Sequence, residues 1–321
     1  MSSGTKNRLA FATEAVFGTP PAAPLKSWGF RGDKLVPGMD SVNDEDTQIG
    51  VQEEGSESIV TKRWVEGPIE YDANMDMLPF WLKHVLGTLA TTGASPTYTH
   101  TLTNNQGEKP SLAAYWEGPL TPAGKLEAAG GLKLRKLDLA SSVGNKVTCT
   151  PDFYGKGAET DTGYSEIAAT MPGINTDPSL ASTHVSSCTI GGVEVKSILK
   201  SWRLTLEPRM TPDEDFGHGS EFLQTLECHG LGISGDLELD LDATTKPLIV
   251  NVLKQTAAPI VLVLTRGAHS ATISLFKPFY TNAAVVGRKG KLKKPLSFKG
   301  YYSHADAKAI QAVIVNGTAA Y

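Results

Sequence analysis

Apolar and polar residues alternate strictly at positions 69–74 and 237–242, within two matching segments that lie about half the chain apart. The first is residues 67–79, GPIEYDANMDMLP, and the second is residues 235–247, GDLELDLDATTKP. Alternation with a period of two is typical of a β-strand with one buried and one solvent-facing side. A slip of one residue would turn the buried set outward, so the shared phase predicts two similar strands. The positions that match without a gap are Gly67, Glu70, Asp72 and Pro79 in the first segment and Gly235, Glu238, Asp240 and Pro247 in the second.

Each alternating segment leads into a predicted short helix. Pro79 and Pro247 stand in the expected first helical turn, where proline is tolerated because its missing N–H would have no helical partner. Asp76 is a candidate N-cap of the first helix, and Thr244 or Thr245 of the second. The residues expected to form an apolar stripe on the first helix are Phe80, Trp81, Val85 and Leu86.

Further matches occur in the same order in the two halves of the chain. They are LKSW at 25–28 and 199–202, DED at 44–46 and 213–215, and VTCTPDFYG at 147–155 with LKKPLSFKG at 292–300. Chance can produce any one of these matches, but a collinear series indicates an internal duplication. The alternative is that two β segments of similar composition resemble each other by accident.

The duplication predicts a mainly β chain with two tandem β-sandwich or partial-barrel domains, each with one short α-helix. The first domain would span residues 1–158 and contain an inserted hairpin at 88–131. Residues 159–182, rich in Gly, Thr, Ala and Pro, would be a linker, and residues 183–321 the second domain. The second domain contains the motif TIGGVEV, whose glycine pair predicts a hairpin turn.

Composition narrows the class of protein. The chain has 321 residues, of which 40% are hydrophobic and 20% charged, and this balance is typical of a packed globular core. Its net charge of -4 argues against a general polyanion binder. The N-terminal segment has no apolar stretch of signal-peptide type, and the longest apolar run, residues 258–264, is too short to span a bilayer. We therefore expect a soluble protein made in a cytoplasm, without a disulfide framework, because its three cysteines are few and widely spaced.

Motifs that carry known chemistry are missing from the sequence. The chain contains no G-x-S-x-G, no G-x-x-x-x-G-K-[ST], no H-E-x-x-H and no C-x-x-C. The best metal candidate is His218 with Cys228 and His229, but two adjacent residues of a strand point to opposite faces. The carboxylate pairs of the two alternating strands fit a solvated or intersubunit face better than an acid/base couple. We expect no enzyme activity, no catalytic residue, no cofactor and no metal site.

Two charged segments of opposite sign stand out. Residues 40–57 hold seven acids and no base, and residues 288–299 hold six bases and no acid. One interpretation is a solvated acidic loop and a lysine-protected edge strand. The other is a pair of complementary surfaces that guide one subunit onto the next. The candidate contact residues between subunits or rings are Asp40, Asp44, Glu45, Asp46, Glu53, Glu54, Glu57, Asp213, Glu214, Asp215, Arg288, Lys289, Lys291, Lys293 and Lys294.

Several motifs resemble those of tail tube proteins of tailed bacteriophages, the major tail protein family of siphophage type. Residues 11–28, FATEAVFGTPPAAPLKSW, resemble the signature that precedes the first strand of that family. Residues 80–102 are similar to its helix and the Tyr-x-His-x-Leu passage that follows, and residues 189–207 to the start of its second half. The matching positions are Glu14, Ala15, Gly18, Thr19, Pro20, Gly87, Tyr98, His100 and Leu102.

The resemblance implies a structural virion protein that self-assembles into stacked rings, forming the hollow tube through which DNA passes during ejection. It implies tape measure, terminator and distal tail proteins as further partners, and DNA that passes the bore without specific binding. The family's loop to the adjacent ring matches residues 36–61, with residues 207–225 as its counterpart. Two fused copies predict a trimeric, pseudo-hexameric ring. The alternatives are a receptor- or carbohydrate-binding β-sandwich, a tail terminator or baseplate protein, and an enzyme on a double β-sandwich.

Overall fold

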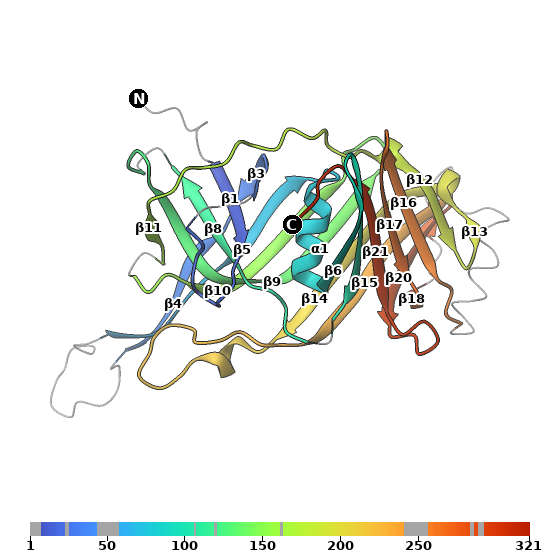
Figure 1. Ribbon diagram of the computed structural model, residues 1–321. Coiled ribbons are helices and arrows are strands. Elements are labelled where there is room, and N and C mark those ends of the chain that lie inside the picture. Colours follow the sequence, from blue (N-terminus) through green and yellow to red (C-terminus); the bar gives the residue numbers. More distant parts are fainter. Residues whose placement is uncertain are drawn as a thin grey trace.

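The protein is mainly β, as the alternating pattern predicts. The computed structural model describes residues 8–22, 26–43, 58–105, 107–118, 121–160, 163–240, 256–282, 286–287 and 292–321. Within these residues the strands form two sheets, of 14 and seven strands, accompanied by one α-helix. Figure 1 shows the larger sheet running along the length of the molecule, with the helix lying against it.

The larger sheet has a main path of antiparallel strands that contains strands from both halves of the chain. In order across the sheet they are β18 (Lys277–Asn282), β20 (Leu292–Tyr301), β15 (Cys228–Asp240), β14 (Leu199–Met210), β9 (Leu126–Ser142), β10 (Thr148–Gly157), β5 (Ser58–Asp72) and β3 (Phe30–Asp33). The strands that join this path from its sides are β1 (Arg8–Thr13), β2 (Lys26–Ser27), β4 (Val36–Asn43), β8 (Leu112–Glu117), β11 (Ser165–Ile167) and β19 (Val286–Gly287).

The smaller sheet covers one side of the larger one. Its order is β13 (Val193–Glu194), β12 (Val185–Ile190), β16 (Ile260–Arg266), β17 (His269–Leu275), β21 (Ile310–Asn316), β7 (Thr97–Asn104) and β6 (Gly87–Ala94). The hairpin of β12 and β13 turns at Gly191 and Gly192, which both have positive φ, so the predicted glycine turn is confirmed.

The predicted first helix is present as α1 (Met77–Leu86) and is buried between the sheets. The ring of Trp81 contacts those of Phe11, Trp28 and Tyr71, at centroid distances of 4.9, 5.7 and 5.8 Å. Nine of the ten helix residues are buried, so the helix has an almost fully buried surface where the sequence predicts an apolar stripe. The helix predicted at Pro247 lies outside the described residues. The described short 3₁₀ segments are η1 (Ser182–His184), η2 (Lys196–Ile198) and η3 (Pro212–Asp215).

Asp76 occupies the N-cap position of α1, as predicted, but its side chain does not cap the helix. The Met77 N–H donates to Asn74 Oδ1 at 2.7 Å, which supplies the capping bond from two residues further out. The Asp76 carboxylate instead accepts hydrogen bonds from the Tyr321 hydroxyl at 2.9 Å and from Asn175 Nδ2 at 2.8 Å. It therefore ties the start of the helix to the last residue and to the segment before β12.

The two halves of the larger sheet have the same strand order and the same register. The path β18, β20, β15, β14 from the second half continues as β9, β10, β5, β3 from the first half, in the same direction. Gly67 on β5 lies opposite Phe153 on β10, and Gly235 on β15 lies opposite Phe298 on β20. The sequence matches at 67–79 with 235–247 and at 147–155 with 292–300 therefore fall on equivalent strand pairs.

Register irregularities also recur at equivalent places in the two halves. The first equivalent pair lies between Leu134 and Lys136 on β9 and between Tyr280 and Asn282 on β18. The second lies between Phe30 and Gly32 on β3 and between Leu199 and Ser201 on β14. The third lies between Asp40 and Ser41 on β4 and between Arg209 and Met210 on β14. A β-bulge adds one residue to one strand and bends it. The matched bulges therefore bend both blocks of strands at the same positions.

The two LKSW segments, by contrast, do not occupy equivalent positions. Residues 199–202 lie in β14, whereas the first copy contributes only the short strand β2. The residue equivalent to Trp202 is Asp33, because Asp33 lies opposite Ile69 on β5 as Trp202 lies opposite Leu237 on β15. The LKSW match is therefore a chance similarity that happens to accompany a real structural repeat.

Strands of the two halves pair directly in both sheets. β9 pairs with β14 in the larger sheet, and β7 pairs with β21 in the smaller one. Nearly all of the β6–β7 hairpin falls in the predicted insertion at 88–131, but β8 and the start of β9, also in that range, belong to the larger sheet. Most of the predicted linker at 159–182 crosses the top of the molecule between β11 and β12 (Figure 1). Leu180 in this segment accepts a hydrogen bond from the Val147 N–H at 3.0 Å.

Candidate assembly surface

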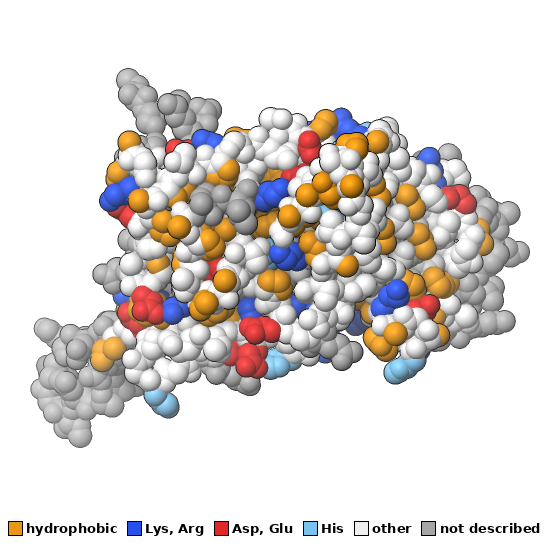
Figure 2. Space-filling model, in the orientation of Figure 1, with side chains coloured by type: hydrophobic (Ala, Val, Ile, Leu, Met, Phe, Trp, Pro, Cys, Tyr) orange, Lys and Arg blue, Asp and Glu red, His pale blue; other side chains and the backbone are white. Residues whose placement is uncertain are grey.

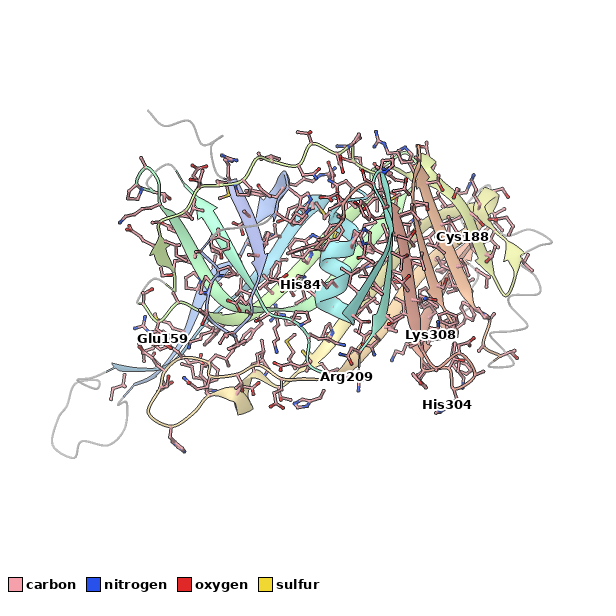
Figure 3. All side chains as sticks on the ribbon, in the orientation of Figure 1. His84, Glu159, Cys188, Arg209, His304 and Lys308 are labelled. Atoms are coloured by element: carbon pink, nitrogen blue, oxygen red, sulfur yellow. The ribbon has the colours of Figure 1, made fainter. Side chains whose placement is uncertain are left out.

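The face of the larger sheet that points away from α1 is polar. On β9, Leu137 and Leu139 are buried in the core, and Asp138 between them points to the opposite face. The same alternation places Arg203 of β14 and Asp152 of β10 on this face. Figure 3 shows side chains on both sides of the sheet ribbons, with His84 of α1 inside the molecule. Strand alternation thus gathers charged side chains from many strands on one broad surface.

Ion pairs lie along and between the strands of this polar face. They are Arg203–Asp138 at 2.6 Å, Lys136–Asp138 at 2.9 Å, Arg135–Asp152 at 3.0 Å, Arg135–Glu66 at 2.9 Å, Lys146–Asp72 at 2.6 Å and Lys200–Asp240 at 2.9 Å. Because each of these bases lies beside an acid, the charges largely compensate one another locally. On the face visible in Figure 2, acidic side chains also occur in small groups, several with lysine or arginine beside them.

Asp138 lies at the centre of the β9–β14 pairing. Its carboxylate accepts hydrogen bonds from Arg203 Nη2 at 2.6 Å and from the Thr205 hydroxyl at 2.5 Å, and it pairs with Lys136. Burial opposes ionisation of this carboxyl, but the bonds from Arg203, Thr205 and Lys136 outweigh that effect and lower the pKa of Asp138. The junction between the two halves therefore contains a carboxylate that is held in its charged form.

The main path of the larger sheet ends in two outer strands, β18 and β3. In Figure 1 they lie on opposite sides of α1. β4 continues the β3 end along β5, and its residues Val36 and Met39 are 54% and 66% exposed. An outer strand offers backbone N–H and C=O groups to a strand of another chain, and exposed apolar residues beside it favour such pairing.

A long hairpin formed by β4 and the first part of β5 projects from the body of the molecule (Figure 1). The chain that follows β14 in the second half braces its base. The Arg63 N–H donates to the Glu221 carbonyl oxygen at 2.7 Å, and Arg63 Nε lies 3.1 Å from the Glu221 carboxylate. The two predicted ring-to-ring segments, residues 36–61 and 207–225, are thus brought together where they leave the sheet.

The structure describes some of the predicted contact residues. Asp40 is exposed on β4, and residues 213–215 form η3. Asp215 accepts hydrogen bonds from the Thr225 hydroxyl at 2.9 Å and the Glu227 N–H at 3.2 Å, so it holds its own loop together. Asp213, Glu214, Lys293 and Lys294 are described only by their backbone, the last two on β20. The candidates outside the described residues are Asp44, Glu45, Asp46, Glu53, Glu54, Glu57, Arg288, Lys289 and Lys291.

The strands that carry the described acidic and basic candidates lie in different parts of the larger sheet. Asp40 belongs to the β3–β4 end of the sheet, and Lys293 and Lys294 belong to β20, beside the outer strand β18. Sequence reasoning missed the β9–β14 pairing and its charged residues. The available signal was alternating charge, in KLRKLDL of β9 and in WRLTLE of β14. That pattern indicates a charged strand face, but it does not identify the partner strand.

Within the part of the chain that the structure describes, no group of three His, Cys, Asp or Glu residues is placed to hold a metal ion. Of the metal candidates, His229 Nε2 lies 3.2 Å from the Thr211 hydroxyl, and Cys228 is half-buried. Among the described helical residues, none forms a helix of the length and apolarity that crossing a membrane requires.

Comparison with known proteins adds a family to this geometry. Residues 4–300 match the model of a family described as phage tail tube protein. The matched range includes most of both halves, among them the β9–β14 junction and the projecting hairpin. A comparison with curated proteins found no match.

Proposed function

The chain belongs to the phage tail tube protein family, and on that premise we propose that it is the major tube subunit, which assembles into stacked rings around a bore for DNA. The observation that carries this proposal is the repeated block of strands in the larger sheet, with an outer strand at each end. Blocks that follow one another in the same direction make a head-to-tail arrangement. Such an arrangement closes into a ring when the rotation from one block to the next is a whole-number fraction of a full turn.

Three chains would complete a ring under this proposal. A tube built from single-block subunits with six-fold symmetry needs six copies. Each chain here carries two blocks with matching registers, so three chains would supply six blocks. The matched bulges support the same conclusion, because each block would contribute the same curvature to the ring. The two blocks would then correspond to two tandem tube domains that share one continuous sheet.

The polar face of the larger sheet would line the bore. DNA must pass through without being held, and a wall with excess lysine and arginine would bind phosphates strongly. The ion pairs of Arg203, Arg135 and Lys146 with acids of neighbouring strands leave these bases compensated. This arrangement supports passage of DNA without specific binding.

Contacts between rings would use the projecting hairpin and the segment that braces it. The acidic candidates belong to these segments, and the basic candidates lie near the other end of the sheet, as complementary surfaces on separate subunits would require. Other tail proteins, including tape measure, terminator and distal tail proteins, would bind the inside and the two ends of the tube. The mature protein would reside in the virion tail after synthesis in the host cytoplasm.

A role in binding receptors or carbohydrates is less well supported. Such modules expose aromatic residues on a face or loop, but Trp28, Trp81 and Trp202 are at most 5% exposed here.

The proposal is tested by concentrating the purified protein, imaging it by negative-stain electron microscopy and measuring the mass of isolated rings. We expect hollow rings or tubes with a mass of three chains per ring. Six chains per ring would contradict the trimer. A protein that stays monomeric at all concentrations, even with preformed tail-tip complexes as initiators, would contradict the tube function.

A further inference from the structure

The chain contains one complete junction between blocks and the two halves of a second junction. β14, the end of the second-half block, pairs with β9, the start of the first-half block. The equivalent of β9 in the second half is β18, continued by β19, and the equivalent of β14 in the first half is β3 with β4. Along the path of the larger sheet, β18 and β3 are the two strands left at the ends.

We propose, building on the tube function, that the β18–β19 edge of one copy pairs with the β3–β4 edge of the next copy, in the register of the internal β9–β14 junction. The occupant of each edge is therefore a second copy of this chain. The proposal rests on continuity of an interface that already exists inside the chain, and on the equivalence of strands across the repeat.

The strand registers fix the equivalent residues. Ala140 of β9 lies opposite Thr148 of β10, and Val286 of β19 lies opposite Lys293 of β20. Thr148 and Lys293 are equivalent because Phe153 and Phe298, five residues further along each strand, occupy the same place opposite Gly67 and Gly235. Val286 therefore stands in the second half where Ala140 stands in the first.

The other edge is assigned in the same way. Arg203 of β14 lies opposite Asp236 of β15, and the Lys34 N–H donates to the carbonyl oxygen of Pro68 at 3.1 Å. Pro68 and Asp236 are the residues that follow the equivalent glycines Gly67 and Gly235. Lys34 therefore stands where Arg203 stands.

The internal junction then gives the pairing between copies. Inside the chain, Arg203 lies opposite Ala140 and Trp202 lies opposite Ser141. By equivalence, Lys34 of one copy would lie opposite Val286 of the next, and Asp33 opposite Gly287. The pairing is antiparallel, as in the internal junction.

Two features of the β3–β4 edge fit this assignment. The last pair of the internal junction is Leu206 with Leu137, and the residue equivalent to Leu206 is Pro37. Proline has no N–H to donate, so it ends a ladder at the position where the internal ladder ends. Val36, equivalent to Thr205, is 54% exposed in the single chain and would be covered by the neighbouring copy.

Closure of the ring through this junction has a measurable size. Each chain contributes the eight strands of the main path, so three chains would give a closed barrel of about 24 strands. With strands about 4.8 Å apart and tilted by roughly 40°, the backbone cylinder would be roughly 45–50 Å in diameter. Side chains of the polar face would narrow the open bore within it.

The register is tested by disulfide cross-linking in assembled protein. A variant that carries both Lys34→Cys and Val286→Cys is allowed to assemble and is then oxidised with diamide. On a non-reducing gel we expect dimers and trimers of the chain, and mass spectrometry of the digest should contain the peptide pair joined through positions 34 and 286. The single variants Lys34→Cys and Val286→Cys are controls for linkage through the native cysteines.

A register-shifted control separates this pairing from mere proximity. Lys34→Cys combined with Gly287→Cys places the second thiol on the other face of the strand, so we expect at least ten-fold less cross-linking. Rings that form without the 34–286 linkage, or that link the shifted pair better, would overturn the junction and leave the tube function standing. Failure of the unmodified protein to form any ring would instead count against the proposed function itself.

Discussion

The two blocks of the larger sheet share their backbone geometry more closely than their side chains. Gly67 and Gly235 both sit where the backbone of the neighbouring strand approaches closely. A Cβ at position 67 would lie 2.0 Å from the Lys34 carbonyl oxygen, and at position 235 it would lie 2.3 Å from the Arg203 carbonyl oxygen. The same close approach thus recurs between equivalent residues, although lysine and arginine differ. The two blocks thus share strand register, bulges and glycines, while the side chains around these features differ.

The largest expected effect on folding comes from these two glycines. Gly67→Ala and Gly235→Ala each force the strands apart, and we expect each to lower the free energy of unfolding by roughly 2–4 kcal/mol. Gly67→Ala should be the more damaging, because Gly67 also has a φ of 137°. Urea unfolding of the monomer, followed by tryptophan fluorescence, measures both values.

Gly173→Ala provides the matched control, because a Cβ there meets nothing within 4 Å. We expect it to change the free energy of unfolding by less than about 0.5 kcal/mol. If Gly235→Ala were as harmless as this control, the close approach would not be shared by the two blocks.

The second largest expected effect is a pH dependence of stability that arises from His84 on α1. Burial lowers the pKa of His84 to about 3, and its ring nitrogens bind the Phe80 carbonyl oxygen at 2.8 Å and the Thr13 hydroxyl at 3.2 Å. An unfolded histidine titrates near 6.5, so stability is full above that pH and is lost as the pH falls toward 3. Between pH 7.5 and pH 5 we expect a loss of about 2 kcal/mol from this residue alone.

Thermal unfolding of His84→Gln across this pH range checks the assignment. As the pH falls, the unfolding temperature of the variant should decrease less steeply than that of the unmodified protein, whatever its stability at neutral pH. His304→Gln, at an exposed histidine, should leave the pH dependence of the unfolding temperature unchanged. An equally steep decrease in His84→Gln would mean that another group causes the pH dependence.

A smaller effect is expected at the internal junction. Asp138→Asn keeps the shape of the side chain but removes the charge that binds Arg203 and Lys136, and it should cost about 1 kcal/mol at pH 7. Because the folded-state pKa of Asp138 is lowered, its contribution is present above its unfolded pKa and disappears as the pH falls through the folded value. The difference between variant and unmodified protein should therefore shrink in acid.

Glu117→Gln is the control for Asp138→Asn. Glu117 pairs with Arg8 at 3.2 Å, but its side chain is 42% exposed, so its loss should be within about 0.5 kcal/mol. Equal losses in the two variants would mean that the junction gains nothing special from Asp138.

The smallest effect on stability should accompany the largest effect on assembly. Val36→Asp places a charge on the exposed β4 edge, so the free energy of unfolding of the monomer should change by less than about 0.5 kcal/mol. At the proposed junction the charge would be partly covered by the neighbouring copy, as Thr205 is at the internal junction, and would lose water on that side, so we expect at least a ten-fold rise in the concentration needed for ring formation. Light scattering against concentration measures this, with Val16→Asp, at another exposed valine, as control. Equal assembly by both variants would contradict the β3–β4 edge as the contact.

Local features of the fold followed from the sequence. The alternation that begins at residues 69 and 237 predicts the last parts of β5 and β15, up to Asp72 and Asp240, in the correct phase, and Pro79 marks the first turn of α1. The glycine pair of the β12–β13 hairpin was equally readable, because a tight turn with positive φ needs such residues. These features depend on neighbours in the chain, which the sequence displays directly.

Pairing between distant strands could not be predicted in the same way. β9 and β14 lie far apart in the sequence, and nothing in KLRKLDL indicates that WRLTLE is its partner. LKSW was misleading because four residues carry too little information, whereas the Gly67 and Phe153 matches were informative because both residues have a geometric role. The outer strands could be identified only once all the pairings were known.

The β9–β14 junction also has a consequence for how fast and at what dilution a ring can form. It joins two blocks within one polypeptide, so it forms at the effective concentration of a tethered reaction, independent of protein concentration. In a ring of three chains, half of the block-to-block contacts are then already made at folding. The yield of complete rings would rise with the third power of subunit concentration, where six separate blocks would require the sixth. A tube built this way could nucleate from a much smaller pool of newly made protein.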